Sequence, residues 1–285
     1  MSGIQDSLVQ ENLSPLDRLA DIADAMFERA TKLDELVPEK IKEKDDASKT
    51  LKEMRNETFQ GVVDVWGAVI ALLPSSGFDQ PTRKEMEIDG LKVISRCYHR
   101  LNQLEAAKQA ITRAIDLGYT DGFISLGAIS MDCEAYDEAE TAFQSAIAKG
   151  VQLMRAHAGL GELYFKQGTL ELKAQTDKHK AFFEKAEEQF LAAGKERFGE
   201  GYERAMELFD AIGWKEKALA FGERAAQYYE DNRIKYGDRL KGLSSRIRRM
   251  AGDERYDKFL SGLGRGLGSI MSGGVRNIEE EKDKK

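Results

Sequence analysis

The sequence has few prolines and few cysteines, and it lacks a long uninterrupted apolar run. Its four prolines all lie within the first 81 of 285 residues, and the remaining 204 residues contain none, although average usage would place roughly ten there. Proline removes a backbone donor and breaks helix interiors. The distribution therefore predicts that most of the chain is helical, with turns made by some of its 26 glycines.

The cysteines and the apolar stretches also indicate the cellular compartment. The two cysteines, Cys97 and Cys133, show no CxxC or Cys/His spacing, which is typical of proteins in a reducing compartment. The longest apolar stretch, 62–73, is interrupted by Asp64 and followed by Pro74, so we expect no segment that spans a bilayer. The first residues lack the basic start and apolar run of a secretory signal. We therefore expect a cytoplasmic protein.

Charge is unevenly distributed along the chain. The net charge is −7, which gives no electrostatic reason to expect a nucleic-acid partner. Residues 233–276 nevertheless hold eleven Lys and Arg against four Asp and Glu. Such a basic segment is either a solvated helix or an interaction tail.

The N-terminal part of the chain divides at its prolines. Ser14 followed by Pro15 and Asp17 is a typical helix start, because it combines a capping hydroxyl with a carboxylate near the free backbone amides. We expect three segments here: disorder over 1–14, a helical hairpin over 15–73 and a linker over 74–84.

After this linker the sequence repeats. Residues 90–119 align with 122–151 at a step of 32 residues, and each segment contains two amphipathic helical patterns with alanines where helices approach closely. Two less regular copies follow. We therefore predict four repeat units: 88–119, 120–151, 154–198 with an insertion near 168–183, and 199–232.

The pattern resembles the tetratricopeptide repeat (TPR) family over residues 85–232. That family places a large residue, a Leu-Gly pair and an aromatic on the first helix of a hairpin, and Ala, an aromatic and Ala on the second. The 120–151 unit matches with Phe123, Leu126, Gly127, Ala139, Phe143 and Ala146. The resemblance implies an all-α, right-handed solenoid, here with an N-terminal helical extension and a C-terminal capping helix. A helical bundle or a solenoid of another repeat family stays open.

The C-terminal part follows another pattern. We expect a capping helix over 233–260 and then a flexible tail over 261–285 that is rich in glycine and ends in charged residues. Basic and apolar residues at helical spacing give this part an alternative role in membrane contact or self-assembly. The residues concerned are Arg246, Arg248, Arg249, Phe259, Leu260, Leu263, Leu267 and Ile270.

The sequence contains no arrangement typical of catalysis. Its three histidines are scattered, and the HExxH, GxxxxGK[ST] and GxSxG motifs are absent. We therefore expect no enzyme activity, no cofactor and no metal.

The resemblance implies that the first helices of successive repeats line a concave groove. The expected function is a protein-binding scaffold or adaptor that holds a peptide or helix of acidic and apolar character, since the groove is basic at its start. The sequence leaves three alternatives open: a cytoplasmic chaperone for a secreted or assembling substrate, a peripheral membrane protein, and a homo-oligomer formed through the N-terminal helices or the tail. The predicted lining of the groove is Lys92, Arg96, His99, Arg100, Ile124, Ala128, Met131, Arg155, Glu162, Phe165 and Lys166.

Overall fold

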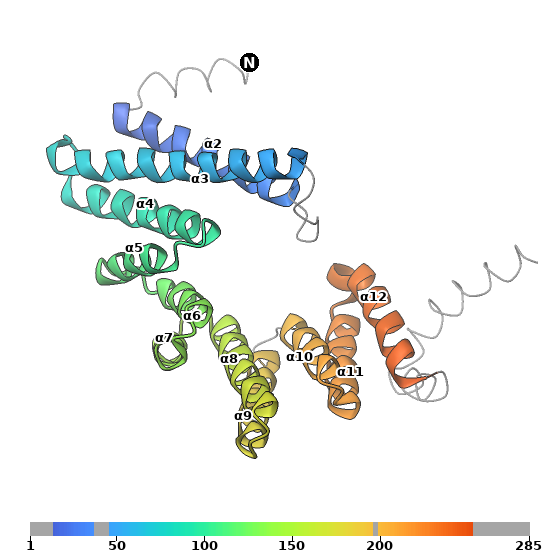
Figure 1. Ribbon diagram of the computed structural model, residues 1–285. Helices are drawn as coiled ribbons and strands as arrows, with labels where there is room; N and C mark the ends of the chain where they lie inside the picture. Colours follow the sequence, from blue (N-terminus) through green and yellow to red (C-terminus); the bar gives the residue numbers. More distant parts are fainter. Residues whose placement is uncertain (1–13, 37–45, 196–198, 253–285) are drawn as a thin grey trace, which may run out of the picture. The chain divides into compact units, whose positions relative to one another are not determined.

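The computed structural model describes residues 14–36, 46–195 and 199–252, and this part of the chain is all-α (Figure 1). It forms eleven α-helices and a short 3-10 helix, Leu73–Ser75. The α-helices are α2 (Pro15–Leu36), α3 (Asp46–Leu72), α4 (Gln80–Arg100), α5 (Leu104–Asp116), α6 (Gly122–Asp132), α7 (Tyr136–Ala148), α8 (Leu153–Lys173), α9 (Lys178–Lys195), α10 (Gly199–Ala211), α11 (Lys215–Asp231) and α12 (Arg233–Ala251).

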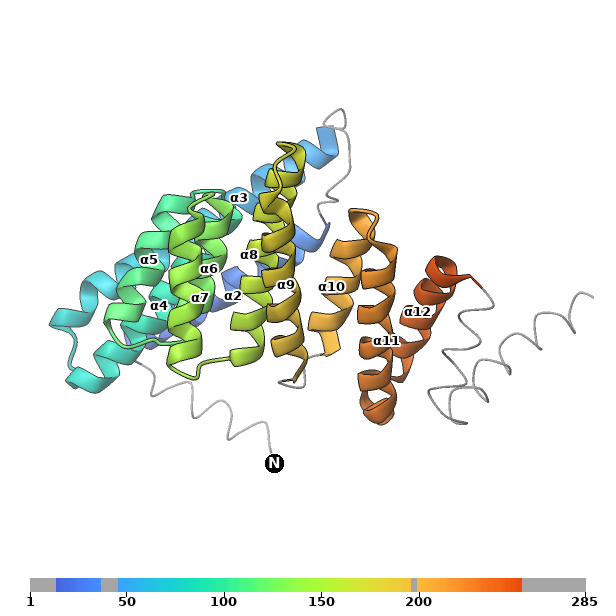
Figure 2. The ribbon, with the colours of Figure 1, turned by 90° about the horizontal axis from the view of Figure 1, so that it is seen from below.

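Successive helices pack as hairpins (Figure 2). The pairs are α2 with α3, α4 with α5, α6 with α7, α8 with α9 and α10 with α11, and α12 then packs against α11. The predicted all-α fold of repeated TPR-like hairpins is confirmed, whereas the handedness of the solenoid stays a prediction.

Four of the hairpins are closed by the same turn. After each first helix one residue adopts a left-handed φ, between 58° and 78°. The next residue then donates its N–H to the carbonyl five positions earlier, at 2.8 to 3.0 Å, as in a common helix C-cap. The left-handed residues are Asn102, Glu134, Gln175 and Gly213. Because only one of them is glycine, the turn recurs in the structure more regularly than it does in the sequence.

Glycines of two first helices sit against an aromatic ring of the second helix. A Cβ atom on Gly127 would lie 2.7 Å from the ring of Phe143, and one on Gly161 would lie 2.7 Å from the ring of Phe190. No side chain fits into that space without displacing the ring. The Leu-Gly and aromatic positions of the motif are therefore a matched pair that sets the distance between the helices.

The other two hairpins of the repeat have different residues at this contact between the two helices. In the α10–α11 hairpin the large residue is on the first helix and the small residue is on the second, since a Cβ atom on Gly222 would lie 2.8 Å from Sδ of Met206. In the α4–α5 hairpin Ser95 replaces the glycine, and its buried hydroxyl donates to the carbonyl of Ala107 at 2.8 Å. The departures from the family pattern thus preserve the packing volume or satisfy the added polar group.

The start of α2 is capped as the sequence predicts. The amide of Asp17 donates to Oγ of Ser14 at 3.2 Å, and the amide of Ser14 donates to the Asp17 carboxylate at 3.0 Å. The predicted linker 74–84 needs correction, because α4 already begins at Gln80. Its first turn is capped by the Asp79 carboxylate, which accepts the Thr82 amide at 2.9 Å.

The chain divides into two compact units, 1–151 and 152–285, and each is described here by itself. In the first unit Phe59 and Trp66 of α3 share one hydrophobic core with Leu91 of α4 and Ile111 of α5. The core therefore continues across the predicted linker, and the division of the chain falls later than expected. In the second unit the residues of the predicted insertion lengthen α8 and α9.

The C-terminal expectations are met only in part by the described residues. The predicted capping helix corresponds to α12, which ends at Ala251. The expectations for 1–13, the remainder of the 233–260 helix and the 261–285 tail lie outside the described residues.

The helix from Lys49 to Ser75 is long and apolar enough to cross a membrane, by length and composition alone, which the sequence did not lead us to expect. A third of its most apolar stretch is buried. Phe59, Val62, Trp66 and Val69 are in the core of the first unit, so core packing accounts for part of its apolar character.

Candidate partner-binding cleft

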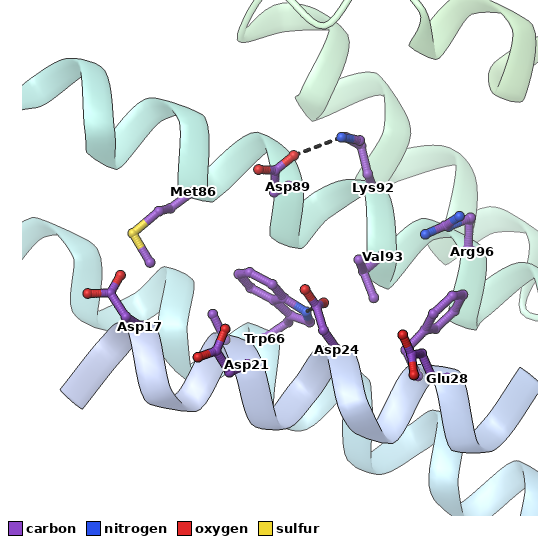
Figure 3. A pocket seen from close by; sticks show the side chains of 12 residues that line it. Asp17, Asp21, Asp24, Glu28, Trp66, Met86, Asp89, Lys92, Val93 and Arg96 are labelled. Carbon is purple, nitrogen blue, oxygen red and sulfur yellow. Dashed lines mark hydrogen bonds and ion pairs between the residues drawn. The ribbon is translucent and has the colours of Figure 1, made fainter. Parts of the chain in front are cut away.

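One side of α2 carries four carboxylates at alternating steps of four and three residues. We call these residues, Asp17, Asp21, Asp24 and Glu28, the α2 acidic stripe. This spacing places their side chains along one side of the helix, and Figure 3 shows them below α4, with Trp66 between. The first unit thus presents a row of negative charge at one edge of its helical array.

The α2 acidic stripe forms one wall of a cleft, and α4 forms the other. We call this site the α2/α4 cleft. Its volume is about 630 Å³, which is in the range of typical ligand sites. Trp66 of α3 lies at its floor, and Phe27, Met86 and Val93 add apolar surface. Nε1 of Trp66 donates to Oδ1 of Asp24 at 3.3 Å, which orients the indole relative to the stripe.

The α4 wall brings two predicted groove residues, Lys92 and Arg96, to the cleft. Nζ of Lys92 donates to Oδ1 of Asp89 at 2.7 Å, and this hydrogen bond raises the pKa of the Lys92 ammonium. The guanidinium of Arg96 lies 4.6 Å from the centre of the Phe27 ring. The lining contains five carboxylates and two cations. The prediction of a basic groove start is therefore corrected: this site is acidic.

The other two predicted groove residues of α4 are paired elsewhere. Nη1 of Arg100 lies 2.8 Å from Oδ2 of Asp34, and Nε2 of His99 lies 2.7 Å from Oδ2 of Asp132. Neither residue lines the α2/α4 cleft. Both are satisfied within the first unit, so they do not form the free basic patch that the sequence indicated.

Most carboxylates of the α2 acidic stripe, in contrast, have no ion-pair partner among the described residues. Among the described residues, Asp21, Asp24 and Glu28 form no ion pair, whereas Asp34 accepts both Arg55 and Arg100. Like charges three or four residues apart on a helix repel one another. The stripe is therefore a concentration of negative charge that the described part of the first unit leaves uncompensated.

The remaining predicted groove residues of the first unit are on α6. Ile124 and Met131 are half-buried and Ala128 is exposed, and none of them lines the α2/α4 cleft. Their contact with a partner stays a prediction.

In the second unit Phe165 is a core residue, which corrects its predicted place in the groove. Its side chain is 7% exposed. Its ring centre lies 5.2 Å from that of Phe183 and 5.5 Å from that of Phe209. The lengthened α9 supplies Phe183, so the insertion closes over a position that would otherwise face outward.

The other predicted groove residues of α8 remain at the surface to different degrees. Oε1 of Glu162 accepts Nε of Arg204 at 2.9 Å. Arg155 is exposed and its guanidinium donates to Oε1 of Gln152 at 3.2 Å, and Lys166 is half-buried. All three residues lie in the second unit, and their contact with a partner stays a prediction.

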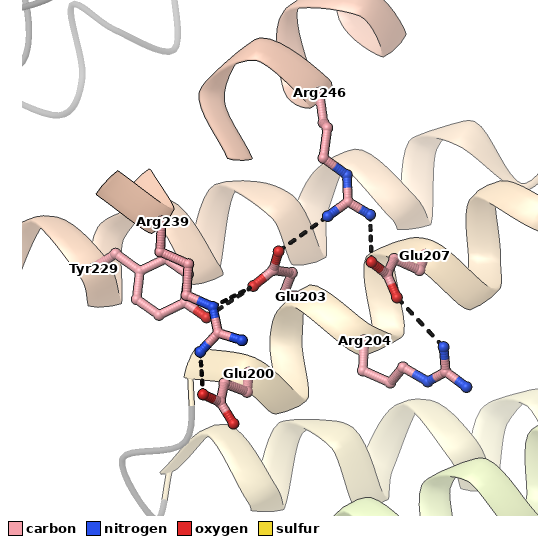
Figure 4. Close-up of polar contacts among 7 residues, drawn as sticks. All are labelled: Glu200, Glu203, Arg204, Glu207, Tyr229, Arg239 and Arg246. Atoms are coloured by element: carbon pink, nitrogen blue, oxygen red, sulfur yellow. Dashed lines mark hydrogen bonds and ion pairs between the residues drawn. The ribbon is translucent and has the colours of Figure 1, made fainter. Parts of the chain in front are cut away.

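A second acidic row lies on α10, and here it is neutralised from within the chain (Figure 4). We call Glu200, Glu203 and Glu207 the α10 acidic stripe. Arg246 of α12 donates to Oε1 of Glu203 at 3.0 Å and also to Glu207. Arg239, seven residues earlier, pairs with Glu200 and lies 3.5 Å from Glu203. Both arginines therefore hold α12, which packs against α11, to α10 as well.

This network gives one of the C-terminal arginines a contact within the chain. Arg246 pairs with the α10 acidic stripe, and its contact with a membrane or a second copy stays a prediction. Arg248 and Arg249 are exposed, and Nε of Arg249 donates to the carbonyl of Ser245 at 3.4 Å. The apolar residues assigned to the same role, Phe259, Leu260, Leu263, Leu267 and Ile270, lie outside the described residues.

The network predicts a loss of stability in acid. Burial by itself would raise the pKa of Glu207, but the hydrogen bonds and charges of Arg246 and Arg204 outweigh it and hold the pKa below its ordinary value of 4.5. A carboxyl group with a lowered folded-state pKa stabilises the fold above its unfolded pKa, and loses that effect as the pH falls through the folded value. We expect the free energy of unfolding to fall as the pH drops below the ordinary value of 4.5 and through the lowered folded-state pKa, and to fall less in Glu207→Gln.

Urea titrations at several pH values measure this difference. Glu188→Gln, at an exposed position of α9, is the control and should keep the parent profile. Superimposable pH profiles for the parent and Glu207→Gln would show that the ion pairs of Glu207 contribute nothing to stability.

The described residues contain no obvious reactive centre. They include no group of three His, Cys, Asp or Glu residues arranged to hold a metal ion. Burial raises the pKa of the Cys97 thiol to about 12 and also raises that of Cys133, so both thiols stay protonated near neutral pH. Of the histidines, His157 lies 2.8 Å from Oε1 of Gln189, a contact typical of a structural role.

The sequence reasoning missed the wall of the cleft that α2 supplies. It assigned 15–73 to an extension outside the repeats and considered Asp17 only as part of a helix start. The signal was nevertheless present, because the four carboxylates of the α2 acidic stripe recur at helical spacing. Trp66 could not have been found in this way, since its position depends on how α3 packs against α4.

No family model and no curated protein matches the chain. Solved structures do match it. The crystal structure of MamA is 17% identical over 67% of this chain and 98% of its own, with a TM-score of 0.40. The crystal structure of nearly identical TPR-like repeats from a Podospora anserina protein assigned as a kinesin light chain is 14% identical over 84% of this chain and 97% of its own, with a TM-score of 0.39. At these TM-scores the matches carry no functional argument.

Proposed function

We propose that this TPR-like repeat protein is a non-enzymatic scaffold that holds a segment of a partner protein in the α2/α4 cleft. The observation that carries the proposal is the cleft itself, which is about 630 Å³ in volume, open, and lined by both apolar and charged side chains. Apolar surface flanked by polar groups is the usual composition of a site that binds peptides. A segment bound there would bury several of its side chains against Trp66 and Met86.

The position of the cleft also supports this function. It lies between the first helices of two successive hairpins, α2–α3 and α4–α5, which is the side on which repeat proteins expose their concave surface. The walls are regular helices packed on the core of the first unit, so the site is formed before a ligand arrives. Such preorganisation lowers the entropic cost of binding.

Substitution of Met86 with arginine tests the proposal. Met86 lines the cleft and is half-buried, so a larger charged side chain there should obstruct a bound segment. We expect a protein that co-purifies with the tagged parent chain to be reduced at least tenfold with Met86→Arg. Quantitative mass spectrometry of the captured fractions measures this ratio.

Met54→Arg is the matched control, because Met54 is 41% exposed on α3 and does not line the cleft. Capture should be unchanged in this variant. If Met86→Arg retains every partner that the parent retains, the cleft is not the binding site and the proposal fails.

A further inference from the structure

The α2 acidic stripe and the α10 acidic stripe occupy equivalent places in their hairpins. The inference rests on the proposed function of the α2/α4 cleft. The α2 acidic stripe is on the first helix of the α2–α3 hairpin, and the α10 acidic stripe is on the first helix of the α10–α11 hairpin. In each case one further helix packs against the second helix of the hairpin: α4 against α3, and α12 against α11.

In the second unit this further helix neutralises the stripe. Arg239 and Arg246 are seven residues apart, which is two turns of α12 and roughly 10 Å along its axis. Their guanidinium groups bridge the three carboxylates of the α10 acidic stripe. A cleft of about 300 Å³ lies beside Glu207 and Arg246, at one end of this network.

In the first unit the corresponding helix does not do this. The cations that α4 brings to the cleft are engaged by other groups: Lys92 by Asp89, and Arg96 by the ring of Phe27. The α2 acidic stripe faces a cleft of about 630 Å³. Among the described residues, no cation of α4 forms an ion pair with the α2 acidic stripe, so the stripe lacks the bridging arginines of the α10–α12 network.

We infer that the partner segment supplies those donors: it is an amphipathic helix that carries two arginines two turns apart. One guanidinium pairs with Asp17 and Asp21 and the other with Asp24 and Glu28. The apolar side chains between the arginines contact Met86 and the edge of Trp66. Arginine is favoured over lysine because its planar fork donates to two carboxylate oxygens at once.

The structure also supplies a probe for this inference. A fluorescein-labelled peptide with the α12 sequence, residues 233–252, carries Arg239 and Arg246 at the required spacing. Its binding to the full-length chain is measured by fluorescence anisotropy at low and at physiological salt. The comparison peptide replaces both arginines with glutamine. We expect the comparison peptide to bind at least tenfold more weakly, with a smaller dependence on salt.

Two variants of the protein locate the binding. Asp21→Asn with Glu28→Gln removes half of the α2 acidic stripe and spares Asp24, which holds the Trp66 indole. The control, Glu53→Gln with Glu57→Gln, makes the same charge change on exposed positions of α3. We expect a rise in Kd of at least tenfold for the first pair and less than twofold for the control. For the first pair, the difference between the two peptides should largely disappear, as expected if the arginines contact these carboxylates.

Several outcomes overturn the inference. Equal weakening by the two protein variants would mean that the peptide responds only to net charge. Loss of binding on replacement of Glu203 and Glu207 alone would place the peptide at α10. If the glutamine peptide binds as tightly as its parent and Met86→Arg still blocks both, the proposed function stands and the arginine requirement falls. If no peptide binds and Met86→Arg also leaves partner capture unchanged, both fall.

Discussion

Replacement of Phe209 with alanine is expected to lower the free energy of unfolding of the second unit by about 3–5 kcal/mol. Phe209 is fully buried at the centre of an aromatic cluster. Its ring centre lies 5.5 Å from that of Phe165, 5.6 Å from that of Phe221 and 6.1 Å from that of Trp214. These rings come from α8, α11 and the turn before α11, so the substitution opens a cavity where two hairpins meet.

Urea denaturation followed by tryptophan emission measures this loss, because Trp214 stacks on the ring of Phe209. Phe182→Ala removes the same side chain from a half-buried position of α9 and should cost much less. Similar midpoints for the two variants would mean that the cluster collapses around the cavity or that the second unit does not depend on it.

The repeat could be predicted from the sequence because its signals are local. The small and aromatic residues that set the distance between two helices lie within one hairpin, as Gly127 and Phe143 do. The turns, which need only a left-handed residue and a backbone hydrogen bond, recur at Asn102 and Glu134 without a glycine. The 199–232 unit, which matches the family pattern least well, keeps a small residue packed against a large one. Here the large residue, Met206, is on the first helix and the small one, Gly222, is on the second.

The candidate site could be predicted only in part because it depends on contacts between hairpins. Lys92 and Arg96 were found from their register in the repeat. What they face is set by α2, which lies outside the residues that resemble the family. The same helix supplies Asp34, which neutralises Arg100. The repeat pattern therefore placed Lys92 and Arg96 in the site correctly but predicted the wrong sign for the net charge of the site.

Phe165 shows a different limit of sequence reasoning. In a repeat of ordinary length its position would face the groove, but α8 and α9 are longer here and bring Phe183 to within 5.2 Å, between ring centres. An insertion changes the environment of residues that precede it. The same argument applies to the predicted linker, where the shared core of Trp66 and Leu91 joins two segments that the prolines had seemed to separate.

Placing a large residue at position 127 and a small one at position 143 is expected to reveal a strong energetic coupling between these two positions. Gly127→Met alone forces a side chain into the ring of Phe143, which would lie 2.7 Å from a Cβ atom, and should cost about 1–3 kcal/mol. Phe143→Ala alone removes a buried ring and should cost about 3–5 kcal/mol. In the double variant the methionine can fill the space that the ring vacates, as Met206 does opposite Gly222.

We therefore expect the double variant to be more stable than the sum of the two single changes predicts, by about 0.5–3 kcal/mol. Thermal and urea denaturation of the four proteins measure this coupling. Gly67→Met combined with Phe143→Ala is the control, because a Cβ atom on Gly67 meets no atom within 4 Å, and its effects should add. Additive losses in both pairs would show that Gly127 and Phe143 do not set the distance between α6 and α7 together. A coupling confined to the first pair would mean that this contact tolerates the large residue on either helix. The α10–α11 hairpin would then keep the packing of the motif while departing from it in sequence.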